Sequence, residues 1–254
     1  MISGVRAARV ALAVQARATS TRLPGKVLVP NMGRPLLAYE LERLRDVAGA
    51  TSRVVATTTN DSDDAIARVA AAEGFDVVRG SEFDVLDRFV QAARFAGADV
   101  IVRVTADCPL IDPCVVDDVI GRYLAGGTDY VSNTLERTYP RGLDVEVCSA
   151  EALITAADEA RTPSQREHVT PYVYANPQRF RIAHVRQKDD LSGERWTVDA
   201  PEDLELVRRI LESLYPTRPR FRQEDVMALL DANPAWRAIN QHVGQRSHLD
   251  AQGA

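Results

Sequence analysis

Cysteine is scarce in this sequence of 254 residues, and long apolar runs are missing. The three cysteines, Cys108, Cys114 and Cys148, are odd in number and have no CxxC spacing. This argues against a disulfide framework or a zinc site and predicts reduced thiols. No segment approaches the roughly 18 consecutive apolar residues of a membrane-spanning helix, and residues 1–8 contain no apolar run long enough for a signal peptide. We therefore expect a soluble cytoplasmic protein.

An excess of basic residues is also absent, since 31 Lys and Arg stand against 36 Asp and Glu, for a formal charge of −5. This balance argues against a dedicated nucleic-acid-binding protein, which usually carries a basic face. One local basic loop would still be enough to bind a triphosphate. The sequence has neither a GxxxxGKS/T P-loop nor a GxGxxG dinucleotide motif, so a nucleotide site would have to use another kind of loop.

Short apolar runs alternate with amphipathic segments along the chain, which predicts an α/β fold with a mainly parallel sheet between helices. We expect one domain over residues 1–254, interrupted by a middle subdomain at about 128–194 and ending in a polar tail at 235–254 whose last dozen residues are loosely ordered. The predicted strands are 10–14, 53–58, 75–79, 99–105, 130–131, 143–147, 180–185 and 195–198. The predicted helices are 35–47, 63–73, 82–96, one opening with Asp112 as cap and Pro113 in its first turn, 150–159, 164–175, 201–214 and 223–230.

The loop after the first predicted strand has the residue types that a triphosphate site needs. Arg17, Arg22 and Lys26 supply three positive charges, and no acidic residue lies between positions 15 and 26. Ligands of open α/β sheets bind beyond the carboxyl ends of strands, which is where this loop lies. Hydroxyl donors and a glycine that permits close approach of the backbone complete the loop: Ser20, Thr21 and Gly25. The alternative is an ordinary solvated surface loop.

Six motifs in order along residues 9–214 resemble one protein family. They are QARATSTRLPGKVL (15–28), RGSEFDVLDRF (79–89), RVTADCPLIDP (103–113), YPRGLDVEV (139–147), REHVTPY (166–172) and RWTVDAPED (195–203). Together they resemble the sugar cytidylyltransferases that activate Kdo and acylneuraminic acids. The resemblance is closer to the branch named for a spore-coat polysaccharide biosynthesis protein.

The resemblance implies a Rossmann-like, GT-A-like nucleotidyltransferase that acts as a homodimer formed through the middle subdomain. It implies transfer of CMP from CTP to a nonulosonic acid or related sugar, with Mg²⁺ and release of pyrophosphate, for surface polysaccharide or glycoconjugate biosynthesis. Lys26, Arg17 and Asp107 would be catalytic. The implied nucleotide-binding residues are Gln15, Ala16, Arg17, Ser20, Thr21, Arg22, Lys26, Arg79 and Thr105.

Two acidic residues follow predicted strands and are candidates for the metal. Asp107 comes after the apolar run VIVRVT, and Asp199 comes after RWTV, so both should project from the same sheet edge as the basic loop. Mg²⁺ commonly takes one or two carboxylates together with phosphates and water, and in the resembling family aspartates at these motif positions hold the metal. Asp107 could instead stabilise a turn, and Asp199 could cap the next helix with a partial capping box. The Kdo branch carries a Gln-Gly-Asp-type segment where this chain has Thr105, Ala106 and Asp107.

Charged residues gather in the middle region, where we predict the acceptor site. If residues 143–147 form a strand, alternation places Asp144 and Glu146 on one face, which would suit a polyhydroxylated or aminated acceptor. Arg141 and Arg166 would suit a carboxylate, phosphate or phosphonate. The predicted acceptor-binding set is Tyr139, Arg141, Asp144, Glu146, Arg166 and His168. The polar face could equally be solvated or paired in salt bridges, and His168 could be a hydrogen-bond donor, a proton carrier or a helix-surface residue.

Two other functions compete with nucleotidyl transfer. A metal-dependent glycosyltransferase of GT-A type would also use carboxylates, but typically in a DxD cluster, and the segment TADCP lacks the second acid. A non-catalytic nucleotide-binding homologue would not need to retain Lys26, Asp107 and Asp199 together. The sequence offers no convincing general base for a hydroxyl acceptor.

Overall fold

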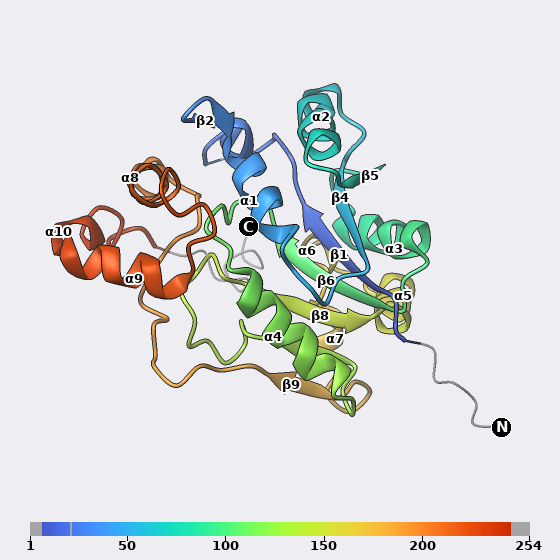
Figure 1. The fold of residues 1–254 in the computed structure, drawn as a ribbon. Coiled ribbons are helices and arrows are strands. Elements are labelled where there is room, and N and C mark those ends of the chain that lie inside the picture. Colours follow the sequence, from blue (N-terminus) through green and yellow to red (C-terminus); the bar gives the residue numbers. More distant parts are fainter. Residues whose placement is uncertain (1–6, 21, 245–254) are drawn as a thin grey trace.

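The computed structural model describes residues 7–20 and 22–244. Within these residues the main sheet has seven strands, and its central strands are parallel (Figure 1). β8 pairs antiparallel with β6 and β7, whereas β9 pairs parallel with β7. The strand order is β5 (Asp76–Gly80), β4 (Ser52–Thr58), β1 (Val10–Gln15), β6 (Val100–Thr105), β8 (Glu146–Ser149), β7 (Tyr130–Ser132) and β9 (Ile182–His184). The predicted α/β fold class is confirmed.

Helices cover both faces of the sheet, so the central strands are buried on two sides. In β1, Val10, Leu12 and Val14 pack into one core, whereas Ala11 and Ala13 pack into the other. The first core is covered by α1 (Leu36–Leu44), α2 (Asp64–Ala72), α4 (Pro113–Leu124), α8 (Pro201–Leu214) and α9 (Gln223–Ala232). The second is covered by α3 (Val85–Ala96), α5 (Ala150–Glu159) and the short helix α7 (Pro171–Tyr174), and the short helix α6 (Pro163–His168) lies against α3.

Several helix boundaries follow from capping residues that the sequence contains. Asp112 caps α4 by accepting a hydrogen bond from the Cys114 amide, with Pro113 in the first turn as predicted. Ser149 caps α5 in the same way, and α5 and α8 have the predicted bounds. The predicted helix 82–96 begins only at Val85, because Asp84 is its cap.

The predicted helix 164–175 is wrong, because it divides into α6 and α7. Pro171 cannot continue a helix, since it lacks the backbone N–H, and it opens α7 instead. Between the helices Val169 has φ 73° and ψ −59°, and the Thr170 amide donates to the His168 carbonyl at 2.9 Å. This is a γ-turn with positive φ, which is strained for a β-branched residue.

Two predicted strands are also wrong. The strand expected at 143–147 begins at Glu146, because the Asn133 side chain bonds the Leu143 carbonyl and the Val145 amide in place of a strand ladder. Asp144 therefore precedes the strand and shares no strand face with Glu146. Within the described residues, the segment 195–198 forms only a single bridge between Arg141 and Arg195. The hairpin of β2 (Pro30–Asn31) and β3 (Arg34–Pro35) and the 3-10 helices η1 (Lys26–Leu28) and η2 (Asp61–Asp63) were not predicted.

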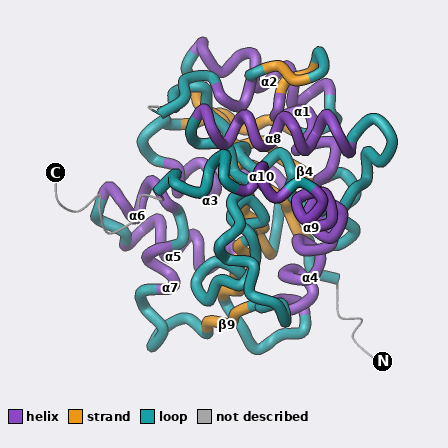
Figure 2. Tube along the Cα trace, turned by 90° about the vertical axis from the view of Figure 1, so that its left-hand side faces the viewer, coloured by secondary structure: helices purple, strands orange, loops and turns teal. Residues whose placement is uncertain are grey.

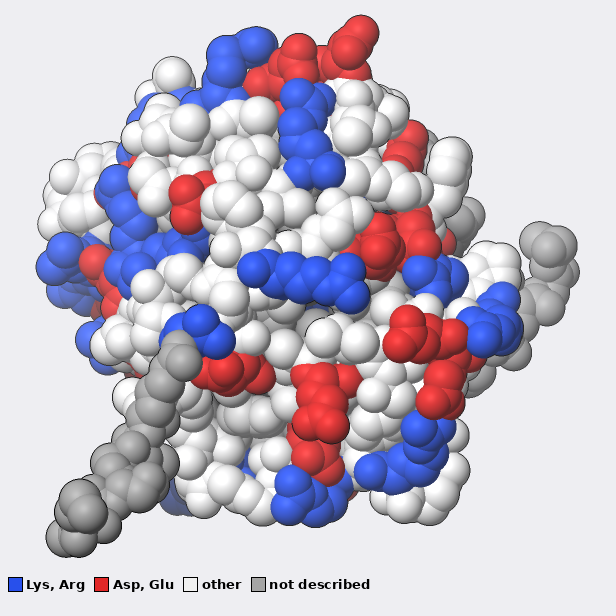
Figure 3. Space-filling view, turned by 90° about the vertical axis from the view of Figure 1, so that its right-hand side faces the viewer, with Lys and Arg blue, Asp and Glu red and all other residues white. Residues whose placement is uncertain are grey.

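The middle region adds β7, β8 and β9 to the same sheet as the N-terminal strands. At the other end of the chain, α8, α9 and the short α10 (Pro234–Arg237) lie together on one side of the molecule (Figure 2). Of the predicted polar tail, residues 245–254 lie outside the described residues. No helix in the described part is long and apolar enough to cross a membrane. On the face drawn in Figure 3, acidic and basic side chains are interspersed rather than separated by sign.

Candidate active site

Two segments that are distant in sequence meet beyond the carboxyl end of β6. Asp107 lies two residues after this strand, and its carbonyl accepts from the Val198 amide at 2.8 Å and from the Thr197 hydroxyl at 3.1 Å. These hydrogen bonds hold Thr197 and Val198, which directly precede Asp199, against the backbone of Asp107. The backbone thus places both aspartates at the sheet edge where β1 also ends.

Lys26 lies between the two aspartates. Its Nζ donates to Asp107 Oδ2 at 2.8 Å and to Asp199 Oδ1 at 2.7 Å. Arg22 contacts the same Asp199 oxygen at 2.7 Å. Gly25, with φ 69°, precedes the 3-10 helix that carries Lys26, so the turn uses a backbone conformation that favours glycine. The predicted meeting of the basic loop with both aspartates is confirmed.

The charges of this cluster stabilise one another. Burial alone would lower the pKa of Lys26, but the adjacent Asp107 and Asp199 outweigh it and raise that pKa. Burial would likewise raise the pKa of Asp107, but Lys26 and nearby hydrogen bonds lower it to about 2. Asp107 is therefore a carboxylate and Lys26 an ammonium at neutral pH.

The two carboxylates fit a magnesium site. Asp107 Oδ2 and Asp199 Oδ1 both accept from Lys26 Nζ, at 2.8 and 2.7 Å, so the separation of the two oxygens cannot exceed the sum of these distances. No group of three or more His, Cys, Asp or Glu side chains in the described part could hold a metal, so phosphates and water would have to complete the coordination. Mg²⁺ is commonly bound in that way, by one or two carboxylates and substrate phosphates.

Asp199 does not cap α8, so the capping interpretation is wrong. The cap position is Ala200, and the Asp203 carboxylate accepts from the amides of both Asp199 and Ala200 at 3.0 Å. Arg195 donates to Asp203 at 2.8 Å and to the second Asp199 oxygen at 3.1 Å. Asp203 thus performs the capping, and the Asp199 carboxylate stays directed at the cations around it.

The other residues of the basic loop are held by acidic or backbone partners. Arg17 donates to Glu167 at 3.3 Å and lies 4.0 Å from Glu82. Thr19 donates to Glu82, and the Ala18 amide donates to Asp63 at 2.8 Å. The remaining predicted loop residues have backbone roles: the Ala16 amide bonds the Ala56 carbonyl, and the Ser20 hydroxyl accepts from the Leu23 amide. Thr21 lies outside the described residues.

The remaining predicted nucleotide-binding residues lie around the same sheet edge. Gln15 and Thr105 are paired neighbours at the ends of β1 and β6. The side-chain oxygen Oε1 of Gln15 accepts from Arg103 at 2.9 Å, and the Thr105 hydroxyl donates to Asp107 at 2.7 Å. Arg79, at the end of β5, donates to the carbonyls of Thr58 and Asn60, at 2.7 and 2.8 Å. Their role in binding nucleotide stays a prediction.

The predicted acceptor residues make different contacts, and their role in binding the acceptor stays a prediction. Glu146 is 7% exposed and accepts hydrogen bonds from Arg103, Tyr130 and Thr170. Burial opposes its ionisation, but Arg103 and these hydrogen bonds lower its pKa. Of the other members, Asp144 pairs with Arg137 and attracts Arg141, Arg166 bonds Asp84 and the Ala157 carbonyl, Tyr139 is buried, and His168 ends α6. Arg141 lines a cavity of about 450 Å³ beside Arg195 and Arg237.

Sequence reasoning assigned no role to three residues that order the site. Arg195 and Asp203 lie inside the motif RWTVDAPED. Asp203 follows Asp199 by four residues, and this spacing could have indicated that the two aspartates compete to cap the helix. Glu40 is fully buried and accepts from the Cys108 amide at 3.0 Å, directly beside Asp107. Its only sequence signal is an acid among the buried leucines of α1.

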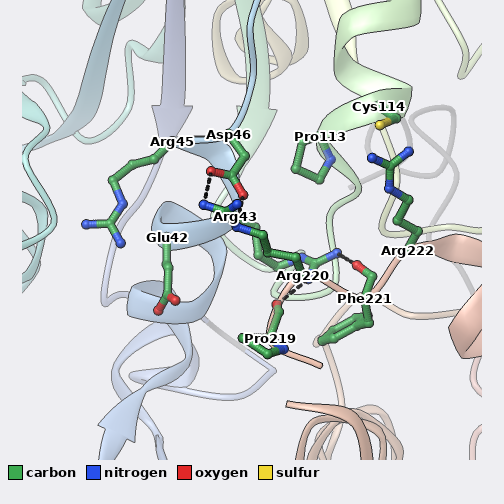
Figure 4. A pocket seen from close by; sticks show the side chains of 10 residues that line it. All are labelled: Glu42, Arg43, Arg45, Asp46, Pro113, Cys114, Pro219, Arg220, Phe221 and Arg222. Carbon is green, nitrogen blue, oxygen red and sulfur yellow. Dashed lines mark hydrogen bonds and ion pairs between the residues drawn. The ribbon is translucent and has the colours of Figure 1, made fainter. Parts of the chain in front are cut away.

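A cavity of about 560 Å³ lies away from this cluster, between the end of α1, the start of α4 and the segment before α9 (Figure 4). Arg43 crosses it and donates to the carbonyls of Pro219 and Phe221, at 3.3 and 2.6 Å. Arg220 pairs with Asp46 at 3.0 Å. These arginines hold the segment before α9 in place, so the cavity offers no sign of the chemistry at Lys26.

Comparison with known proteins agrees with the site. Residues 11–230 match the family described as Cytidylyltransferase. The chain is 37% identical over 241 residues to an uncharacterized protein of Methanocaldococcus jannaschii, covering 94% of this chain and 97% of that protein. It is 33% identical over 228 residues to a spore coat polysaccharide biosynthesis protein of Bacillus subtilis, and the match covers 87% of this chain and 93% of that protein. A solved cytidylyltransferase from Leptospira borgpetersenii has a TM-score of 0.87 and 32% identity, covering 95% of this chain and 100% of that one. The chain therefore belongs to the cytidylyltransferase family and is a nucleotidyltransferase.

Proposed function

We propose that the protein transfers CMP from CTP to a sugar-like acceptor, a nonulosonic acid or related sugar, for surface polysaccharide or glycoconjugate biosynthesis. An acceptor hydroxyl oxygen forms a bond to the α-phosphorus of CTP and gives its proton to water, the bond from that phosphorus to the β-phosphate oxygen breaks, and pyrophosphate leaves. The observation that carries the proposal is Lys26 Nζ within 2.8 Å of both Asp107 and Asp199. A cation between two carboxylates marks the place where phosphate and a divalent cation can enter together.

The cations of the loop act by exchanging partners. Lys26, Arg22 and Arg17 now hold carboxylates, and they would hold phosphate oxygens once the triphosphate enters. Asp107 and Asp199 would then bind Mg²⁺, which supplies charge neutralisation at the attacked phosphate. Asp107, with its pKa lowered to about 2, is too weak a base to take the acceptor proton. Positioning and electrostatics therefore carry the catalysis.

The cavity beside Arg141 is our proposed place for the acceptor's acidic group. Arg141 lines it together with Arg195, whose guanidinium contacts Asp199 at 3.1 Å, so the cavity borders the proposed metal site. Burial, and after it repulsion from Arg137 and Arg195, lowers the pKa of Arg141 against the attraction of Asp144, so two further arginines lie close enough to Arg141 to act on it. Such a region favours a carboxylate or phosphate.

The test is pyrophosphate release from each of the four NTPs against a panel of nonulosonic acids, amino sugars and phosphonates, with and without Mg²⁺. We expect release from CTP with at least one acceptor, dependent on the divalent cation. Sugar transfer from a nucleotide sugar without pyrophosphate release would favour a GT-A glycosyltransferase instead. CTP binding without turnover of any acceptor, and with function retained in an Asp107→Ala strain, would favour a non-catalytic homologue.

We also propose a homodimer that works in the cytoplasm, formed through residues of the region 128–194. Light scattering at micromolar concentration should give twice the chain mass of 27.9 kDa. A monomer under these conditions would contradict the dimer.

A further inference from the structure

The guanidinium of Arg88 is buried and has no hydrogen-bond partner among the described residues. Arg88 lies in the first turn of α3 and is 0% exposed. Within the part of the chain that the structure describes, its Nε, Nη1 and Nη2 atoms all lack an acceptor. Its side chain lies across Gly80, where a Cβ would come within 2.8 Å of Arg88 Cγ. A buried guanidinium has five N–H donors and is costly to leave unpaired, so its place calls for an explanation.

Three carboxylates act on Arg88 electrostatically, yet each is bonded to other groups. Burial and then repulsion from Arg17 lower the pKa of Arg88 to about 10, against the attraction of Asp63, Glu82 and Asp84. Asp63 accepts from the Thr58 and Ala18 amides at 3.2 and 2.8 Å. Asp84 caps α3 and accepts from Arg166 at 2.8 Å. Glu82 accepts from Thr19 and from Asn60, the latter at 2.7 Å, and lies 4.0 Å from Arg17.

Of these three carboxylates, Glu82 is the one whose partners are side chains that a bound triphosphate would engage. Asp63 accepts from backbone amides, including that of Ala18 in the basic loop, and Asp84 caps α3 and holds Arg166. Glu82 holds Thr19 and Arg17, which belong to the basic loop. A triphosphate would compete for both, because its oxygens are acceptors with more charge than a single carboxylate.

We propose that Glu82 exchanges partners when nucleotide binds, leaving Thr19 and Arg17 and pairing with Arg88, so that Arg88 is a positioning residue for the nucleotide-bound state. This inference rests on the proposed function. In the free protein Glu82 holds the basic loop in place, and the Arg88 guanidinium has no acceptor in the described part of the chain. In the bound protein the triphosphate takes the loop side chains, and the released carboxylate satisfies the buried guanidinium. Pairing of a buried charge favours the bound state, because an unpaired one is the more costly arrangement.

The proposal is tested by measuring CTP affinity and thermal stability in the same variants. Calorimetry with CTP and Mg²⁺, and thermal unfolding without nucleotide, are applied to the wild type, Arg88→Met, Glu82→Gln and the double variant. We expect Arg88→Met to weaken CTP binding by about tenfold while raising the Tm of the free protein by about 2–4 °C, since an unpaired buried charge is replaced by an apolar side chain. The double variant should bind CTP no more weakly than Glu82→Gln alone.

The control is Arg94→Met, which changes an exposed arginine of the same helix and should alter neither quantity. Should Arg88→Met fail to fold, Arg88→Lys retains the charge and should recover part of the CTP affinity. A lower Tm with unchanged CTP affinity in Arg88→Met would overturn the inference, and so would effects of Arg88→Met and Glu82→Gln that multiply in the double variant. Absence of CTP binding by the wild type would overturn the proposed function itself.

Discussion

Charged residues behave differently at the two ends of the proposed reaction site. At the nucleotide end, Lys26 faces two aspartates whose side chains are 11–22% exposed. Arg22 and Arg17, with side chains 39% and 30% exposed, also hold carboxylates. At the acceptor end, Glu146 is buried under three donors and Arg166 is held by Asp84 and a backbone carbonyl. We propose that the first set exchanges its partners for a ligand, whereas the contacts of the second set join elements of the fold.

The difference shows that a polar residue in a family motif can serve either substrate or structure. What separates the two cases is whether its partners are other loop side chains or fixed parts of the sheet and helices. Asp107 and Asp199 pair with a lysine from a loop. Glu146 pairs with Arg103 of β6 and Tyr130 of β7. The comparison therefore predicts large effects on turnover at the first end and large effects on stability at the second.

Lys26→Ala should have the largest effect. We expect turnover to fall by about 10³-fold or more, because the group that neutralises the phosphates and holds both aspartates is lost. Pyrophosphate release measures the loss, and circular dichroism should show an unchanged fold. Lys188→Ala, which removes an exposed lysine, is the control. Normal pyrophosphate release by a folded Lys26→Ala protein would contradict a phosphate-binding role for this end of the site.

Glu146→Ala should have the next largest effect, on stability. Removing one partner of a buried ion pair leaves Arg103 uncompensated, which costs about 3–5 kcal/mol of unfolding free energy. Urea denaturation measures the change. In the double variant Arg103→Met with Glu146→Leu, much of the loss should be recovered, because apolar residues of similar volume replace both charges. An unchanged denaturation midpoint combined with weaker acceptor binding would instead indicate that Glu146 binds the acceptor.

The nucleotide end could be predicted from sequence because it follows from topology. Once the strands ending at Gln15 and Thr105 are parallel neighbours, their following loops must meet at one sheet edge, and Lys26 meets Asp107 there. The bounds of α5 and α8 were predictable for a similar reason, since Ser149 and Pro201 are local start signals. Local sequence and strand direction were sufficient for both.

The side-chain contacts at the acceptor end could not be predicted, because these side chains find partners from distant elements. Nothing near Glu146 in the sequence indicates that Tyr130 and Thr170 will donate to it. The strained turn at Val169 is equally hidden, since a β-branched residue gives no local sign of φ 73°. Asp199 and Asp203 competed for the helix cap within five residues, and only tertiary contacts with Lys26 and Arg195 decided between them.

Acid titration should distinguish the nucleotide end with a smaller effect. The pKa of Asp107 lies at about 2 instead of 3.8, because Lys26 outweighs the burial that opposes ionisation. A carboxyl with a lowered folded-state pKa stabilises the fold above its unfolded pKa and loses that contribution as pH falls toward the folded value. We expect about 2 kcal/mol of stability to be lost between about pH 4 and pH 2.

Urea unfolding across this pH range measures the loss for the wild type and for Asp107→Asn. The variant should have a flatter profile, because it lacks the titrating group. Asp158→Asn, which changes an exposed residue of α5, should keep the wild-type slope. Identical profiles for the wild type and Asp107→Asn would mean that Lys26 does not stabilise the Asp107 carboxylate.

Asp144→Ala should have the smallest effect on stability and would show whether the acceptor end is structural throughout. Its pair with Arg137 is partly exposed, with side chains 33% and 14% accessible, so its loss should cost less than about 1 kcal/mol. We expect the KM for the acceptor to rise about three- to tenfold with kcat nearly unchanged, because a carboxylate that binds substrate hydroxyls contributes equally to ground and transition states. An unchanged KM would make every acid of the motif YPRGLDVEV part of the fold, and acceptor recognition would then rest on Arg141 and the cavity that it lines.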